Sequence, residues 1–202
     1  MRILRRAMLL GLVAGVAAFA LGAPAMRARA ATDPAAFVQQ LGNQAIETLT
    51  GGDVTAEERR ERFRTLLDAN FDVPAIGKTV LGRYWKVATP EEQQEYLGLF
   101  ENFLVKNYAK RFAEYSGQTF DVRGTRSEPG DNLTVQTVVK APDSGDPARL
   151  DWLLRPDGDG FKILDLKIEG ISMAETHRSE FASVIQSKGG KVSGLLEALK
   201  SK

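Results

Sequence analysis

The chain has 202 residues, among them 27 lysines and arginines, 26 aspartates and glutamates, one histidine and no cysteine. Without cysteine it has neither disulfides nor thiolate metal ligands, so its hydrophobic core alone must stabilise the fold. The net charge is only +1, whereas a nucleic-acid-binding protein is expected to carry a basic stripe. We therefore expect no nucleic-acid partner, no metal and no cofactor.

The first thirty residues have the pattern of a signal peptide. A basic start at residues 2–6 precedes an apolar run over residues 7–21, and the small-x-small sequence Ala28-Arg29-Ala30 follows. The run has 15 residues, fewer than the roughly 20 that span a bilayer, so we favour cleavage over a retained anchor. Residues 1–30 contain five arginines and no carboxylate, so cleavage changes the net charge from +1 to −4. We expect residues 31–202 to form a single exported domain.

Three helices are expected in the first part of that domain. Residues 33–50 carry apolar side chains at every fourth position, and two glycines follow them. Thr55 and Glu58 have the spacing of a capping box, so a second helix should begin there and run to about Asn70. Pro74 suits the first turn of a short third helix, which should end near Leu81.

The strongest helical signal follows Thr89. This residue is a capping threonine, Pro90 occupies the first helical position and Glu92 the third, so a helix should begin here and continue to about Tyr115. An apolar stripe at 3-4 spacing follows, with charges on the opposite face. The stripe consists of Tyr96, Leu99, Phe100, Phe103, Leu104, Tyr108 and Phe112.

After Gly117 the apolar residues recur with a period of two, which indicates strands. Four strands are expected, at residues 118–125, 132–140, 149–155 and 161–169. Their loops are short, so neighbours should pair antiparallel as a meander. Two helices should close the chain, near residues 174–187 and 191–199. Helices followed by consecutive strands indicate an α+β fold with helices packed on one face of a four-stranded sheet.

Three short motifs suggest chemistry, and each lacks a required residue. Gly77-Lys78-Thr79 lacks the upstream glycine of a phosphate-binding loop, since position 72 is Asp. Residues 156–160 lack the further ligands of an EF-hand and should form a hairpin turn. His177 is the only histidine, and no G-x-S-x-G sequence accompanies it. We therefore expect a surface or capping role for His177 and no enzymatic activity.

Four segments, in their order and spacing, carry a resemblance to a known family. They are Leu81-Gly82-Arg83-Tyr84-Trp85-Lys86, Ala88-Thr89-Pro90-Glu91-Glu92-Gln93, the Glu-Gly-Ile-Ser-Met corner at residues 169–173, and Arg178-Ser179-Glu180-Phe181. Over roughly residues 35 to 200 the chain resembles the MlaC-type periplasmic lipid-binding proteins, also called toluene-tolerance auxiliary proteins. The wording of residues 115–117 and 178–181 also resembles a branch associated with hopanoid metabolism.

The resemblance implies a soluble, monomeric periplasmic carrier. Such a carrier binds phospholipid acyl chains between a strongly bent sheet and the helices, and shuttles lipid between an outer-membrane lipoprotein complex and an inner-membrane ABC transporter complex. It thereby maintains outer-membrane lipid asymmetry. Two alternatives stay open: a carrier of hopanoid or another hydrophobic molecule, and an adaptor that docks on an ABC transporter without carrying lipid. Trp152 and Phe161 depart from the family pattern but remain aromatic, so they bear on pocket width and cargo.

The resemblance also favours a pocket where residue counting alone favours a dry core. The implied lipid-binding residues are Val80, Tyr84, Trp85, Leu99, Phe100, Phe103, Leu104, Tyr108, Phe112, Val135, Val139, Trp152 and Ile168. Arg83 and Lys86 flank the Tyr84-Trp85 pair, where we expect the pocket to open. They are candidates for partner docking, and the alternative is that both are solvated charges at a helix end.

Overall fold

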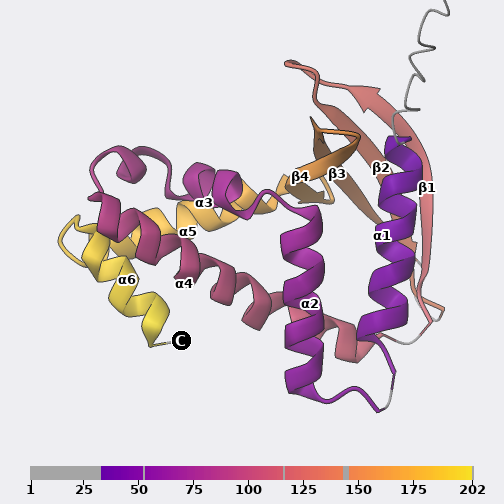
Figure 1. Ribbon diagram of the computed structural model, residues 1–202, viewed down its shortest axis with the longest axis horizontal. Helices are drawn as coiled ribbons and strands as arrows, with labels where there is room; N and C mark the ends of the chain where they lie inside the picture. Colours follow the sequence, from indigo (N-terminus) through magenta and orange to yellow (C-terminus); the bar gives the residue numbers. More distant parts are fainter. Residues whose placement is uncertain (1–32, 52, 116, 143–145, 202) are drawn as a thin grey trace, which may run out of the picture.

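Six α-helices, two 3₁₀ helices and one antiparallel sheet make up the part of the chain that the computed structural model describes, residues 33–51, 53–115, 117–142 and 146–201. The sheet lies at one end and a cluster of helices at the other, with two helices packed against the sheet (Figure 1). The expected signal peptide lies outside these residues. No helix in the described ranges is both long and apolar enough to cross a bilayer.

The first three helices follow the predicted bounds closely. They are α1 (Pro34–Leu49), α2 (Ala56–Asn70) and α3 (Val73–Leu81). The capping box that begins α2 is confirmed, because Thr55 accepts from the Glu58 amide at 3.2 Å and Glu58 accepts from the Thr55 amide at 3.0 Å. Asp72 caps α3 by accepting from the Ala75 amide at 3.0 Å. These local bonds satisfy amides that have no partner inside a helix, so they fix where each helix begins.

The long helix is shorter than predicted. After the 3₁₀ helix η1 (Gly82–Lys86), α4 runs over Pro90–Tyr108, and the expected extension to Tyr115 is instead the 3₁₀ helix η2 (Ala109–Glu114). A 3₁₀ turn has about three residues rather than 3.6, so it rotates Phe112 away from the α4 stripe. The Phe112 ring packs on Phe63 of α2, with ring centroids 5.9 Å apart.

The sheet has five strands rather than four, in the order β1-β2-β3-β4-β5, all antiparallel. The strands are β1 (Thr119–Ser127), β2 (Leu133–Lys140), β3 (Ala148–Asp157), β4 (Gly160–Ile168) and β5 (Ile171–Ser172). The predicted meander is confirmed. The fifth strand is only two residues long and follows a tight turn in which Glu169 and Gly170 have positive φ. A pair of residues carries no periodicity, so the sequence pattern could not predict it.

The last two helices are α5 (Met173–Ser187) and α6 (Val192–Lys200). Ser172 caps α5 by accepting from the Glu175 amide at 3.1 Å. Gly189 and Gly190 separate the helices, and both have positive φ, near 79° and 76°. Residues other than glycine rarely adopt this backbone conformation, so the two glycines permit the chain reversal that packs α6 against α4 and α5.

Two hydrophobic cores result. In the sheet-side core, α1 and α2 cover the sheet, and Val38, Leu49 and Val135 are fully buried. In the helical core, α3, α4, α5 and α6 pack together around Tyr96 and Phe100, which are also fully buried. The chain therefore buries its apolar surface in two places that need a rigid connection.

Strand β4 makes that connection. Lys162 donates to the carbonyls of Asp68 and Ala69 in the last turn of α2, at 2.9 and 2.8 Å. The Ile163 carbonyl accepts from the Asp72 amide at 3.0 Å, where α2 passes into α3. Asp165 accepts from the Ser172 hydroxyl at 2.6 Å and from the Ala174 amide at 3.1 Å, at the start of α5. Three residues of one strand thus fasten α2, α3 and α5.

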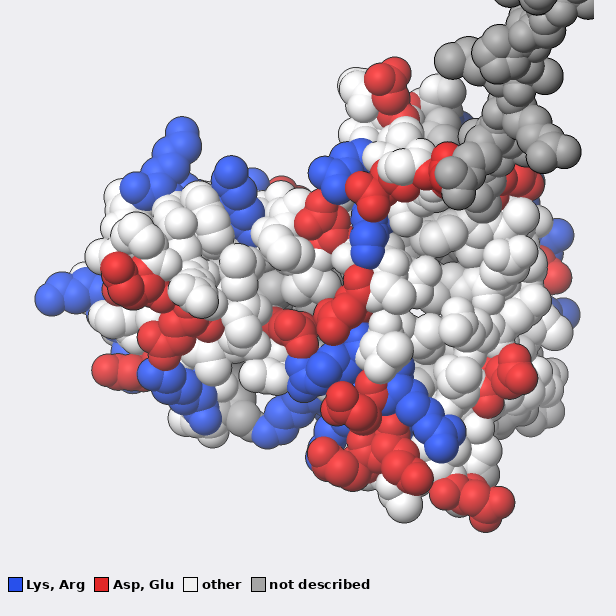
Figure 2. All heavy atoms as spheres, in the orientation of Figure 1, with Lys and Arg blue, Asp and Glu red and all other residues white. Residues whose placement is uncertain are grey.

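Acidic and basic side chains are interspersed on the face of the molecule shown in Figure 2, most densely over α2. Arg60 pairs with Glu57 at 2.8 Å, and Arg64 pairs with Glu101 of α4. No helix or strand on this face carries a continuous row of basic side chains. Pairs as exposed as Arg60–Glu57 contribute about 0.5 kcal/mol or less each, so burial in the two cores dominates the stability.

Replacing Asp165 with Ala should lower the free energy of unfolding by about 2 kcal/mol, because the partly buried Ala174 amide and Ser172 hydroxyl at the start of α5 lose their acceptor. Urea denaturation followed by circular dichroism measures the change. Asp146→Ala removes an exposed carboxylate and is the control, expected to be neutral. Equal stability of both variants would show that Asp165 does not fasten α5 to the sheet.

Candidate functional site

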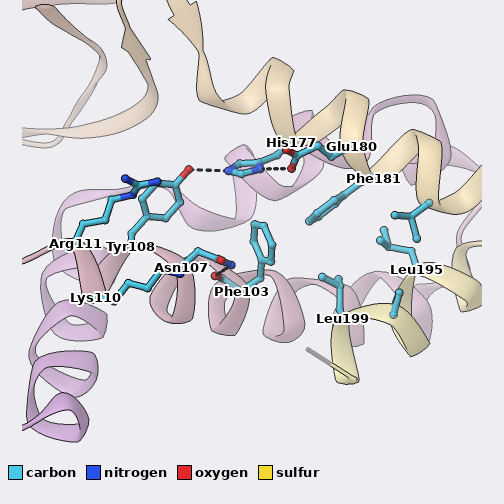
Figure 3. Close-up of a pocket in the computed structure, with 12 residues that line it drawn as sticks. Phe103, Asn107, Tyr108, Lys110, Arg111, His177, Glu180, Phe181, Leu195 and Leu199 are labelled. Carbon is cyan, nitrogen blue, oxygen red and sulfur yellow. Dashed lines mark hydrogen bonds and ion pairs between the residues drawn. The ribbon is translucent and has the colours of Figure 1, made fainter. Parts of the chain in front are cut away.

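A pocket of about 370 Å³ opens between α4, α5 and α6 in the helical core (Figure 3). Its volume is at the small end of the ~300–1,000 Å³ range of ligand pockets. Its walls are Phe103, Asn107, Tyr108, Lys110, Arg111, His177, Glu180, Phe181, Val184, Leu195, Ala198 and Leu199.

One end of the pocket is apolar. Phe103 of α4 and Phe181 of α5 pack edge to face with ring centroids 5.2 Å apart. Leu195 and Leu199 of α6 lie beyond them (Figure 3), and Phe181 and Leu195 are almost fully buried. Amphipathic stripes on three different helices converge here, so this end can cover a hydrocarbon group.

The other end contains a chain of hydrogen bonds. The Tyr108 hydroxyl lies 2.8 Å from Nε2 of His177, and Nδ1 of His177 lies 2.9 Å from the Glu180 carboxylate. A carboxylate only accepts, so the proton between His177 and Glu180 belongs to Nδ1. The surface or capping role predicted for His177 is wrong: its side chain is only 13% exposed. Packing of α5 on α4, which the sequence pattern does not specify, buries the ring beside Phe103.

Two cations, Lys110 and Arg111, lie at the same end (Figure 3). Both are exposed residues of η2. Neither forms an ion pair with any residue that the structure describes. The 3₁₀ turn that ends α4 brings both side chains to the pocket, so the pocket is apolar at one end and positively charged at the other.

Burial raises the pKa of the Tyr108 hydroxyl. The Arg111 guanidinium opposes this rise, while Glu180 and Asp165 add to it. Burial also raises the pKa of Tyr96, whose hydroxyl donates to the Gly77 carbonyl at 3.0 Å inside the helical core. Both tyrosines are therefore neutral in the folded protein wherever an exposed tyrosine would begin to ionise.

The predicted lipid-binding residues are divided among several places. Only Phe103 and Tyr108 line this pocket. Val80, Phe100 and Leu104 are buried in the helical core, with Tyr84, Trp85 and Leu99 packed against it. Val135 is buried in the sheet-side core, with Phe112 and Trp152 packed against it. Val139 and Ile168 are partly buried on the sheet. The lipid-binding assignment of these residues stays a prediction.

Arg83 and Lys86, the predicted docking pair, are exposed on η1 and do not line the pocket. The Arg83 guanidinium lies over the Tyr84 ring, 5.0 Å from its centroid, and donates to the Tyr84 hydroxyl at 3.1 Å. This pocket opens between α4, α5 and α6 and not beside η1, and a docking role for Arg83 and Lys86 stays a prediction.

The pocket residues that sequence reasoning missed come mostly from α5 and α6. His177, Phe181 and Val184 recur at 3-4 spacing on α5, and Leu195, Ala198 and Leu199 do so on α6. This spacing identifies the inner face of each helix, but it does not say which helices meet. No cluster of His, Cys, Asp or Glu among the described residues is suited to a metal ion.

The fold and the pocket together define an α+β protein with a site suited to an amphiphilic ligand. The family model described as MlaC protein matches residues 16–201, so the chain belongs to the MlaC family. This confirms the resemblance; the hopanoid-associated branch stays a prediction.

The proteins similar to the chain include two curated relatives and one solved structure. It is 24% identical over 130 residues to the toluene tolerance protein ttg2D of Pseudomonas putida, a match that covers 64% of this chain but only 60% of that protein. It is 21% identical over 168 residues to the intermembrane phospholipid transport system binding protein MlaC of Haemophilus influenzae, covering 79% and 78% of the two chains. A phospholipid-binding protein from Ralstonia solanacearum, solved in complex with a phospholipid, superposes with a TM-score of 0.73 at 28% identity, covering 84% of this chain and 96% of that one.

Stability should fall as the pH rises above about 10, the pKa of an unfolded tyrosine. Below that pH both states keep the phenol proton; above it the unfolded tyrosines ionise while Tyr96 and Tyr108 stay neutral, so unfolding becomes more favourable. The double variant Tyr96→Phe/Tyr108→Phe should lose less stability than wild type between about pH 9 and about pH 11, measured by urea denaturation. Tyr84, whose pKa the Arg83 hydrogen bond lowers, provides the control variant Tyr84→Phe. A loss in the double variant as large as in wild type would contradict the buried, neutral state of the two phenols.

Proposed function

We propose that the protein is a periplasmic phospholipid carrier that binds lipid in the α4–α5–α6 pocket and moves it between the outer membrane and an inner-membrane ABC transporter complex. The pocket itself supports this function, because it is apolar at Phe103, Phe181 and Leu199. It is polar at Tyr108 and Arg111. The fold shared with a protein solved in complex with a phospholipid supports it. Cleavage of residues 1–30 would deliver residues 31–202 to the periplasm as one lipid-binding domain.

The binding energy would come from the acyl chains. Each methylene removed from water contributes about 0.8 kcal/mol, so a chain of about sixteen carbons contributes on the order of 12 kcal/mol before the costs of binding. Affinity on that scale keeps lipid bound in water without a covalent step. Release must then depend on a partner that competes for the lipid or separates the helices.

A complete diacyl lipid needs more room than the pocket provides, so α6 must move away from α4. This movement would expose Val192, Leu195 and Leu196, which α6 buries in the helical core, while few polar contacts oppose it. Lys191 at its N-terminus offers no side-chain cap, Gly189-Gly190 precede it, and one ion pair, Lys200 with Glu95, joins it to α4 among the described residues. Outward movement of α6 would extend the apolar end of the pocket between Phe103 and Leu199.

Filling the pocket should reduce lipid binding without unfolding the protein. Ala198 lines the pocket on α6, so in Ala198→Trp the indole would occupy space that the acyl chain needs. We expect several-fold less lipid to co-purify, measured by native mass spectrometry of protein from its own periplasm; lipid extraction identifies the cargo as phospholipid or hopanoid.

Ala56→Trp is the matched control, because Ala56 is exposed at the start of α2. It should retain wild-type lipid, and both variants should keep a cooperative melt by circular dichroism. A folded Ala198→Trp protein with undiminished lipid would place the cargo elsewhere. Wild-type protein that never contains lipid would favour the adaptor over the carrier.

Docking on the two membrane complexes must be reversible, so it should use exposed polar groups rather than a large apolar patch. Arg83 and Lys86 remain our proposal for this surface. Reversing both to Glu should leave bound lipid unchanged but slow lipid transfer to proteoliposomes that contain the transporter complex. Lys78→Glu/Lys106→Glu, on exposed faces of α3 and α4, controls for the change in net charge. Wild-type transfer by the Arg83/Lys86 variant at low salt would assign docking to another surface.

A further inference from the structure

The two ends of the pocket differ in polarity. Phe181, Leu195 and Leu199 form its apolar end, and Lys110 and Arg111 lie at the other end beside Tyr108 (Figure 3). An amphiphile would therefore bind in one orientation, with its hydrocarbon over the aromatic rings and its head group at the cations. The same geometry bears on which head groups bind best.

The basic side chains at the polar end are not neutralised by carboxylates of the pocket lining. Lys110 and Arg111 have no ion-pair partner among the described residues, and the nearest carboxylate of the lining, Glu180, accepts from Nδ1 of His177 at 2.9 Å. The lining therefore contains two basic side chains of η2 against one carboxylate, which already binds His177. Among the described residues the Tyr108 hydroxyl binds His177, and a hydroxyl has one donor and two acceptor sites, so it can also bind a head-group hydroxyl.

We propose that Lys110 and Arg111 select phospholipids whose head group has a net negative charge, an inference that rests on the proposed carrier function. A guanidinium and an ammonium both bind phosphate oxygens, the guanidinium in a bidentate manner. A zwitterionic head brings its own ammonium to the same place, where it competes with the protein cations for the phosphate. An anionic glycerol head brings no cation and adds hydroxyls that can reach Tyr108.

The preference should be modest, because both cations are exposed and screened by salt. Two solvent-exposed ion pairs to the head group should favour an anionic lipid over a zwitterionic lipid by about fivefold. Delipidated protein is incubated with vesicles of equimolar phosphatidylglycerol and phosphatidylethanolamine that have identical acyl chains, and the bound lipids are counted by native mass spectrometry. Wild type should contain about five times more phosphatidylglycerol than phosphatidylethanolamine. The ratio of the two bound lipids should fall as the salt concentration is raised.

Lys110→Gln/Arg111→Gln should lose the preference, because its binding of phosphatidylglycerol should fall to the level of its binding of phosphatidylethanolamine. Lys78→Gln/Lys106→Gln makes the same charge change on exposed residues outside the pocket and should keep the preference. Equal binding of both lipids by wild type, or loss of the preference in both double variants, would overturn the inference and leave the carrier function intact. Absence of any bound lipid from wild type would overturn both.

Discussion

The attachment of three helices to strand β4 is the constraint on which the arrangement of this protein depends. Within four residues of that strand, Lys162 binds the end of α2, Ile163 binds the α2–α3 corner and Asp165 binds the start of α5. Each of these bonds satisfies a backbone group at a helix end, where no intrahelical partner exists. The two hydrophobic cores are thereby kept in one relative position, although they share few side chains.

The pocket is a consequence of that position. Because β4 fixes where α5 begins, His177 and Phe181 of α5 contact Phe103 and Tyr108 in the second half of α4. The Gly189-Gly190 reversal returns α6 to cover both helices. The α4 helix then ends in a 3₁₀ turn, which moves Phe112 to the sheet-side core and brings Lys110 and Arg111 to the pocket. A single change of helical pitch thus separates an apolar end from a cationic end.

Local chemistry predicted most of the fold but little of the site. Capping residues such as Thr55 and Thr89, and the switch to a period of two after Gly117, predicted the helices, the strands and their antiparallel order. The end of α4, the two-residue β5 and the burial of His177 were wrong or missed, since each depends on a partner distant in sequence. Periodicity correctly marked the inner faces of α5 and α6, yet only packing shows that Phe181 and Leu199 meet Phe103 across one pocket.

Photo-crosslinking can locate the acyl chains of the bound lipid. Protein loaded with a phospholipid that carries a diazirine near the end of one acyl chain is irradiated, digested with trypsin and analysed by mass spectrometry. If lipid binds in the α4–α5–α6 pocket, labelling is expected within residues 192–200 of α6 and near Phe181 of α5, at the apolar end of the pocket. Labelling confined to the sheet, around Val139 and Ile168, would contradict binding in this pocket and place the acyl chains between the sheet and the helices.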